Sequence, residues 1–400
     1  MKSICIGLLA VACAAAIPFQ GAEAAKANLK ILHSFGTGSD GMLPEGNLIS
    51  VKGTLYGATH LGGAHGGGTV YALNPASSTE SIIYSFCSQQ RCADGEYPTA
   101  GLIDVKGVLY GTTRNGGTSG KGAVFSVDTK TGAEQVLYSF CSQQNCTDGQ
   151  FPKASVIDVN GTIYGTTYGG GSAGKGTVFS VDPTTGAEQV VYSFCSQQSC
   201  ADGSNPDAGM ISANSLLYGT TFKGGAKGMG TVYSLDPGTG SEMVLYSFCS
   251  QQGCADGQYP LSAVIEENGT LYGTTYGGGS QGAFGTVYAV DAGTGAESVL
   301  YSFCSKNNCA DGEFPYASLN DVNGTIYGTT GYGGEYNGGT LFSLDPTTGA
   351  LSLINAFCTQ QNCTDGGFPQ AGVVDMKGTL FGTTFGGGTG YGTAFAIKSP

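Results

Sequence analysis

The sequence predicts an all-β fold, a seven-bladed β-propeller of four-stranded antiparallel blades, and three observations lead to it. A Y-G-T-T motif recurs every 54 or 55 residues, with its aromatic position at Tyr56, Tyr110, Tyr164, Tyr218, Tyr272, Tyr327 and Phe381. Each copy contains four short runs rich in Val, Ile, Tyr, Phe and Thr, separated by Gly, Asn, Asp and Pro. Seven repeats of this length are typical of propellers, in which each sheet buries both faces against its neighbours.

Within one repeat, strands are expected at 100–105, 108–113, 123–128 and 134–140. Asn-Gly pairs at 160–161, 268–269 and 323–324 predict tight turns between first and second strands, because both turn residues need positive φ. Strand direction alternates, so the second-to-third loops share one face with the blade-to-blade connections. We call this the loop face. We expect function there, because the turns of the opposite face are short.

The two ends of the chain predict a closed ring. The last repeat stops after its third strand, whereas residues 29–35 match the fourth strand of the other repeats. The N-terminal strand is therefore expected to complete blade seven, which leaves no sheet edge open between the two termini. Residues 25–400 would then form one domain.

Residues 1–24 have the features of a secretory signal peptide. Lys2 precedes an apolar run at 4–17, and Ala22-Glu23-Ala24 forms a small-x-small cleavage site. Lipoprotein processing at Cys13 is the less favoured alternative. We expect a secreted monomer, extracellular or periplasmic, with no membrane span after cleavage. The net charge of −13 disfavours nucleic acid as a partner.

Cysteine usage agrees with export. Twelve cysteines form six C-x4-C pairs: Cys87 and Cys92, Cys141 and Cys146, Cys195 and Cys200, Cys249 and Cys254, Cys304 and Cys309, Cys358 and Cys363. The even count and the identical spacing predict six local disulfides. Metal binding is disfavoured, because each pair offers two thiolates and these loops contain no histidine. No metal and no cofactor is expected.

A D-G-x-x-P motif follows each fourth strand. Its aspartates are Asp40, Asp94, Asp148, Asp202, Asp256, Asp311 and Asp365. They could form a calcium-binding ring or cap turns. The turn interpretation is favoured, because symmetric blades hold their loops apart and calcium needs six to eight converging oxygens.

Positions that vary between copies are better candidates for a ligand site. The residues after Y-G-T-T are His60, Arg114, Tyr168, Phe222, Tyr276, Gly331 followed by Tyr332, and Phe385. Those before the loop proline are Leu43, Tyr97, Phe151, Asn205, Tyr259, Phe314 and Phe368. Aromatic side chains stack well on sugars and apolar ligands. The favoured alternative is that they pack between blades or against the disulfide loops.

No residue is predicted to be catalytic. His60 and His65, with Arg114 in the next blade, are the one His/Arg group of the mature sequence that could act as a general base or bind a metal. No carboxylate lies near them in sequence to orient them.

The repeat pattern, P-x-A followed by N-G-T-(L/I)-Y-G-T-T-x-x-G-G and G-T-V-(F/Y)-x-(L/V)-D-P-x-T-G, resembles the GloVer tandem repeat of "choice-of-anchor" proteins. Its Gly-Gly pair is also similar to kelch repeats, which form propellers. The resemblance implies an exported bacterial protein, often tethered by a C-terminal anchor. This chain ends at Lys398-Ser399-Pro400 without such a segment, which favours release or retention through a partner.

These observations favour a non-catalytic binding or interaction module at or outside the bacterial cell surface. Its expected partner is a glycan or an envelope protein. One alternative is an enzyme acting on extracellular polysaccharide, with its site at the axial mouth of the loop face. Another is a structural component of the envelope.

Overall fold

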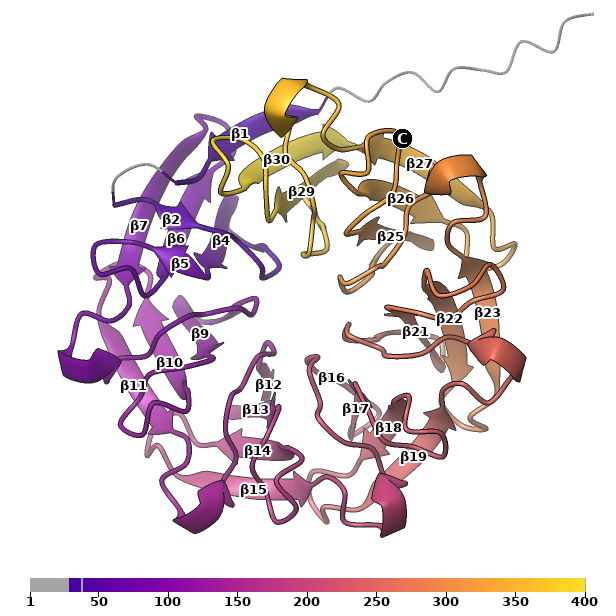
Figure 1. Ribbon diagram of the computed structural model, residues 1–400. Coiled ribbons are helices and arrows are strands. Elements are labelled where there is room, and N and C mark those ends of the chain that lie inside the picture. The colour runs from indigo at the N-terminus through magenta and orange to yellow at the C-terminus, as the bar shows by residue number, and fades with distance from the viewer. Residues whose placement is uncertain (1–28, 37–38, 400) are drawn as a thin grey trace, which may run out of the picture.

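The computed structural model describes residues 29–36 and 39–399. In this part of the chain, seven four-stranded antiparallel sheets stand around a central axis, which confirms the predicted propeller (Figure 1). The predicted signal peptide lies outside the described residues.

Each blade runs from a short inner strand to a long outer strand. Blade one contains β3 (Ile49–Val51), β4 (Thr54–Thr59), β6 (Thr69–Asn74) and β7 (Thr79–Ser85), blade two contains β8 (Ile103–Val105), β9 (Val108–Thr113), β10 (Ala123–Asp128) and β11 (Glu134–Ser139), and blade three contains β12 (Ile157–Val159), β13 (Thr162–Thr167), β14 (Thr177–Val181) and β15 (Glu188–Ser193). Blade four contains β16 (Ile211–Ala213), β17 (Leu216–Thr221), β18 (Thr231–Leu235) and β19 (Glu242–Ser247), and blade five contains β20 (Ile265–Glu267), β21 (Thr270–Thr275), β22 (Thr286–Asp291) and β23 (Glu297–Ser302). Blade six contains β24 (Asn320–Val322), β25 (Thr325–Thr330), β26 (Thr340–Leu344) and β27 (Leu351–Ala356), and blade seven contains β28 (Val374–Asp375), β29 (Thr379–Thr384), β30 (Thr393–Lys398) and β1 (Lys30–Ser34).

Two kinds of smaller element lie on the connections. Strand β2 (Gly41–Met42) pairs with β5 (Leu61–Gly62). One-turn 3-10 helices occupy the cysteine loops: η1 (Gln90–Cys92), η2 (Gln144–Cys146), η3 (Gln198–Cys200), η4 (Gln252–Cys254), η5 (Asn307–Cys309) and η6 (Gln361–Cys363).

The strands expected for residues 98–140 agree with the structure except at the first. Strand β8 begins at Ile103 rather than Ala100, because residues 99–102 run toward the axis before they meet a partner strand. The Asn-Gly turns are confirmed, with φ of 55° and 86° at Asn160 and Gly161.

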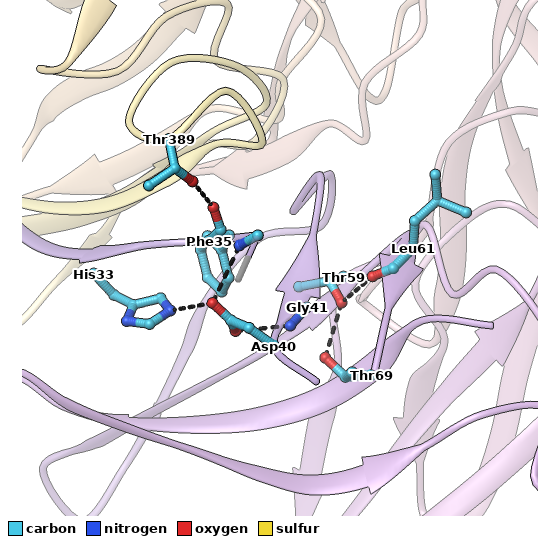
Figure 2. Close-up of polar contacts among 9 residues, drawn as sticks. His33, Phe35, Asp40, Gly41, Thr59, Leu61, Thr69 and Thr389 are labelled. Atoms are coloured by element: carbon cyan, nitrogen blue, oxygen red, sulfur yellow. Dashed lines mark hydrogen bonds and ion pairs between the residues drawn. The ribbon is translucent and has the colours of Figure 1, made fainter. Parts of the chain in front are cut away.

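The ring closes as predicted, since β1 pairs with β30 as the outer strand of blade seven. Lys30 lies opposite Ala396, and Ser34 lies opposite Thr393. Beyond the strand, Phe35 N–H donates to the Gly392 carbonyl at 3.0 Å. Thr389 Oγ1 donates to the Phe35 carbonyl (Figure 2). Strands from the two ends of the chain therefore share one sheet.

The hydrophobic core is divided into seven clusters, each between neighbouring blades. A phenylalanine that follows the fourth strand of one blade contacts an aromatic ring on the third strand of the next. Phe86 and Phe125, for example, meet edge to face with centroids 4.8 Å apart. The other pairs are Phe140 with Phe179, Phe194 with Tyr233, Phe248 with Tyr288, Phe303 with Phe342, Phe357 with Phe395, and Phe35 with Tyr71.

The glycine of Y-G-T-T makes room for this ring. Gly111 lies directly opposite Phe125 in the β9–β10 ladder, and a Cβ added at Gly111 would lie 2.7 Å from Phe125 Cζ. The corresponding glycine of every blade faces the same obstruction. The absence of a side chain therefore lets the third-strand ring lie flat on the second strand.

The two threonines of the motif have separate roles. Thr166 Oγ1 donates to the Ala208 carbonyl of the next blade at 3.1 Å, beside the axis. Thr167 Oγ1 lies 2.8 Å from Thr177 Oγ1 on the third strand of its own blade. One hydroxyl therefore joins blades and the other joins strands, both where water is excluded.

We predict that Gly111→Ala destabilises the protein by about 1–3 kcal/mol, because Phe125 must leave its place between two blades. Gly238→Ala, in an exposed turn with Asp236 as its nearest neighbour, is the control and should change stability by less than about 0.5 kcal/mol. Denaturant unfolding measures both. Equal effects would contradict the proposed role of the glycine.

Candidate functional site

The predicted loop face is formed by paired backbone segments. Each blade-to-blade connection forms an isolated bridge or a short ladder with the second-to-third loop of the blade that follows, as between Gln150 and Gly169. Tyr168 N–H also donates to the Phe151 carbonyl at 3.1 Å. This contact places the variable residue after Y-G-T-T beside the variable residue before the loop proline, and it recurs in every blade.

The connections are stiffened by the six predicted disulfides, each of which forms between the expected cysteines. Asp94 lies inside its loop, where its Oδ2 accepts from Ser88 N–H at 2.8 Å and from the Tyr84 hydroxyl at 2.8 Å. Asp148, Asp202, Asp256 and Asp311 accept the same set of bonds. The turn interpretation of these aspartates is confirmed.

A buried carboxyl from the next blade faces four of these aspartates. Glu134 begins β11, and its Oε1 is buried without a hydrogen-bond partner. Burial, and then the charge of Asp94, raise the pKa of Glu134 to about 7. Glu188, Glu242 and Glu297 repeat this arrangement, each with a pKa raised to about 7.

We predict that the propeller is most stable in mild acid. These four glutamates bind protons more tightly when folded than when unfolded, where their pKa is near 4.5. The stability present below about pH 4.5 is therefore lost as pH rises through about 7. Calorimetric melting temperatures between about pH 5 and pH 8 should fall with pH.

The matched test replaces the four glutamates by glutamine. The variant Glu134→Gln/Glu188→Gln/Glu242→Gln/Glu297→Gln should melt at a temperature less dependent on pH, whereas exposed Glu267→Gln should behave as wild type. An unchanged pH slope in the fourfold variant would contradict this origin.

The two predicted rings of variable residues interleave into one aromatic collar on the loop face. His60 stacks on Tyr97 with centroids 5.0 Å apart. Each such pair joins a second-to-third loop to the connection that leaves the same blade. The further pairs are Phe222 with Tyr259 at 5.1 Å, Tyr276 with Phe314 at 4.8 Å, and Tyr332 with Phe368 at 5.4 Å.

A cavity of about 300 Å³ lies on the axis, inside this collar. Its wall is formed by Arg114 and by the residues directly after the loop prolines: Glu45, Thr99, Lys153, Asp207, Leu261, Tyr316 and Gln370. This ring was missed by the sequence interpretation. Its signal was present, since the position x in P-x-(A/S/G) varies in every copy.

Charge is unevenly distributed around the cavity. Arg114, Lys153, Asp207 and Glu45 come from blades one to four, whereas Leu261, Tyr316 and Gln370 come from blades five to seven. Lys153 Nζ lies 3.1 Å from the Asp207 carboxylate and 4.0 Å from the centre of the Tyr168 ring. Burial raises the pKa of Asp207, and Lys153 and Arg114 oppose that shift.

No carboxylate is near His60 in sequence, but the fold brings one beside it. Glu45 Oε1 lies 3.5 Å from His60 Nδ1, because the loop ladder folds the connection back on the second-to-third loop. His65 is exposed on the loop between β5 and β6.

A second pocket, of about 200 Å³, opens beside the axial cavity over blades six and seven. It is lined by Tyr316, Gly331, Tyr332, Phe368, Gln370 and Phe385. Tyr316 and Gln370 border both spaces, so the aromatic pocket and the charged cavity are adjacent.

The seven predicted ligand-binding residues therefore fall into three places. Arg114 lines the axial cavity, and Tyr332 and Phe385 line the aromatic pocket. His60, Phe222 and Tyr276 stack in the collar, and Tyr168 lies beneath Lys153.

Fold and loop face together define a disulfide-stabilised seven-bladed propeller with an axial recess. The chain belongs to the Gloeobacter/Verrucomicrobia repeat family, whose sequence model matches residues 21–177 and 152–395. This confirms the resemblance to GloVer repeats. No functionally curated protein matches the sequence.

Solved structures share the fold at low sequence identity. An oligogalacturonate lyase from Vibrio parahaemolyticus has a TM-score of 0.55 and 11% identity, covering 94% of this chain and 95% of that chain. An oligogalacturonate lyase in complex with manganese has a TM-score of 0.53 and 12% identity, covering 94% and 93%. A puromycin hydrolase has a TM-score of 0.51 and 12% identity, covering 85% of this chain and 50% of that chain.

The structure also bears on the compartment. Six disulfides indicate an oxidising environment outside the cytoplasm. Within residues 29–36 and 39–399, no helix is long and apolar enough to cross a membrane.

We predict that Lys153→Met destabilises the protein by about 1–3 kcal/mol, because Asp207 loses its closest cation in a largely buried position. The double variant Lys153→Met/Asp207→Leu should recover most of the loss, since no unpaired charge remains. Denaturant midpoints measure both, with exposed Lys130→Met as control. A double variant as unstable as the single one would contradict the pairing.

Proposed function

We propose that this protein is a non-catalytic glycan-binding module at or outside the bacterial cell surface. The observation that carries the proposal is an aromatic pocket directly beside a charged axial cavity on the loop face, with Tyr316 and Gln370 lining both. Sugars have apolar C–H faces and a polar rim of hydroxyls. A site with stacking rings on one side and charged side chains on the other complements both.

The aromatic side supplies stacking surfaces. Tyr332 is 38% exposed, so one of its faces is accessible to a ligand, while Phe368 supports it from the neighbouring blade. Phe385 and Tyr316 complete the pocket. Tyr and Phe lose little conformational entropy on binding, because packing already orders them.

The polar side supplies hydrogen bonds. Gln370 lies at the junction of the two spaces, and Arg114 and Lys153 line the cavity beyond it. Arginine offers up to five donors in a planar fork, which suits vicinal hydroxyls and sugar carboxylates. The glycan would enter along the propeller axis, and one of its sugar rings would bind in the aromatic pocket.

The residue before each loop proline has a left-handed backbone conformation. Phe368, Phe314 and Tyr259, for example, have φ of 59°, 55° and 60°. That region is unfavourable for bulky residues, and glycine or asparagine would adopt it at lower cost. Because the same positive φ occurs at all seven positions, it belongs to the repeated scaffold, which holds these aromatic side chains on the loop face.

The setting of the protein is part of the proposal. The predicted signal peptide and the six disulfides support an extracellular or periplasmic location. We propose a monomer, since β1 already occupies the edge of β30 that the last three strands would otherwise offer to a second chain. If no glycan binds, two interpretations remain: the partner is an envelope protein, or the protein has a purely structural role in the envelope.

A second candidate is an enzyme that acts on extracellular polysaccharide. His60 beside Glu45, near the mouth of a cavity with Arg114 and Lys153, favours it. Two proteins of similar fold are oligogalacturonate lyases, although the likeness is one of fold alone. A lyase acting on uronate chains would leave an unsaturated product that absorbs ultraviolet light.

The test is a glycan array followed by affinity measurement on the best ligand. Tyr332→Ala/Phe385→Ala should weaken binding about tenfold or more, since each stacking contact contributes about 0.5–1.5 kcal/mol. Tyr336→Ala is the matched control, because this tyrosine is 53% exposed in the same loop but lies outside the pocket.

Three results decide between the candidates. Binding that survives Tyr332→Ala/Phe385→Ala would place the site elsewhere. An array without any bound glycan would reject the proposal. Turnover of a bound polysaccharide that is lost in His60→Ala would establish the enzyme instead.

A further inference from the structure

The seam between blades seven and one differs from the other blade connections. In five connections a tyrosine of the fourth strand donates to the loop aspartate, as Tyr84 does to Asp94. At the seam the tyrosine position is occupied by His33, and its Nε2 lies 2.9 Å from Asp40 Oδ2 (Figure 2). The cysteine pair of the other connections is also missing there.

A third ligand-type side chain reaches the same place from blade one. Glu80 lies in β7, and its Oε1 is buried without a hydrogen-bond partner. The same unpartnered oxygen occurs in four equivalent glutamates, Glu134, Glu188, Glu242 and Glu297. Each of these glutamates faces a tyrosine hydroxyl of the preceding blade, whereas Glu80 faces the His33 imidazole.

Among the described residues, three groups of His, Cys, Asp and Glu side chains could converge on an ion. Two of them contain a disulfide, whose sulfurs are not thiolates. The third is His33, Asp40 and Glu80, whose ligand atoms all lie within 4.8 Å of one another.

We propose that His33, Asp40 and Glu80 bind a divalent transition-metal ion of the Zn²⁺ type, which fastens the seam. Imidazole nitrogen and carboxylate oxygen are both Zn²⁺ ligands, and water can take the fourth position of a site with three protein ligands. Ligands of one tetrahedral ion lie about 3.4 Å apart, so a side-chain movement of about 1 Å brings the three together. Calcium is a poorer match, since it needs six to eight oxygens.

The surroundings orient the ligands. Gly41 N–H donates to Asp40 Oδ1 at 2.7 Å, and Gly36 N–H donates to Oδ2 at 3.1 Å. The His33 ring packs edge-on against Phe35, whose centroid lies 4.7 Å away. These contacts hold Asp40 and the imidazole in place before an ion arrives, as outer-shell groups do in metal sites.

The ion would join β1, the following connection and β7. It would therefore link the N-terminal strand of blade seven to the outer strand of blade one, where no disulfide stiffens the connection. No metal site is expected from the sequence alone, because Glu80 belongs to a different blade from His33 and a whole repeat lies between them.

The experiment uses tag-free mature protein, stripped with chelator and then dialysed against Zn²⁺. Elemental analysis should find one Zn²⁺ per chain, and Zn²⁺ should raise the melting temperature by a few degrees. His33→Tyr introduces the residue found at this position in blades one to five, so it should fold and should lose both effects.

Two matched pairs of variants complete the test. Glu80→Gln should weaken Zn²⁺ binding at least about tenfold, whereas Glu134→Gln, the equivalent residue between blades one and two, should not. His65→Ala, which removes an exposed histidine, should bind as wild type. Failure of the wild type to bind Zn²⁺, or equal binding by folded His33→Tyr, would overturn the proposal. Neither result depends on the glycan site.

Discussion

The ring depends on one aromatic contact that is made seven times. A phenylalanine leaving each blade meets a ring that lies over the Y-G-T-T glycine of the next blade. Edge-to-face contacts of this kind add to the burial of two large side chains. Since both aromatic side chains are fully buried, their contact sets the distance between neighbouring blades and therefore the diameter of the propeller.

Repetition separates scaffold from site. Some residues are the same in every copy, such as Gly111, Thr167 and Asp94. The scaffold uses the missing side chain of the glycine and the polar side-chain atoms of the other two. Residues that differ, such as Lys153 and Tyr316, border the axial cavity. A seven-fold scaffold thus presents an asymmetric recess, with charge over one half and aromatic rings over the other.

Most of the architecture could be predicted from the sequence, because period, turns and strand composition all act locally. Strands β9 and β10 and the six disulfides lie where expected. The site was predicted in part. Arg114, Tyr332 and Phe385 do border its two spaces, but Asp207 and Gln370 were missed, because the turn toward the axis after each proline is a property of the closed ring. The approach of Glu45 to His60 likewise requires the loop ladder.

The pairing of β1 with β30 has a consequence for how the chain folds. The first strand of the propeller must wait for the last one, so blade seven is completed by the strand pairing of longest sequence separation among residues 29–36 and 39–399. Contacts of that kind form slowly, since a long loop has to close first. Until then the outer edge of β30 is an unpaired strand that can accept a segment of another chain, and the N-terminal strand acts as its internal competitor.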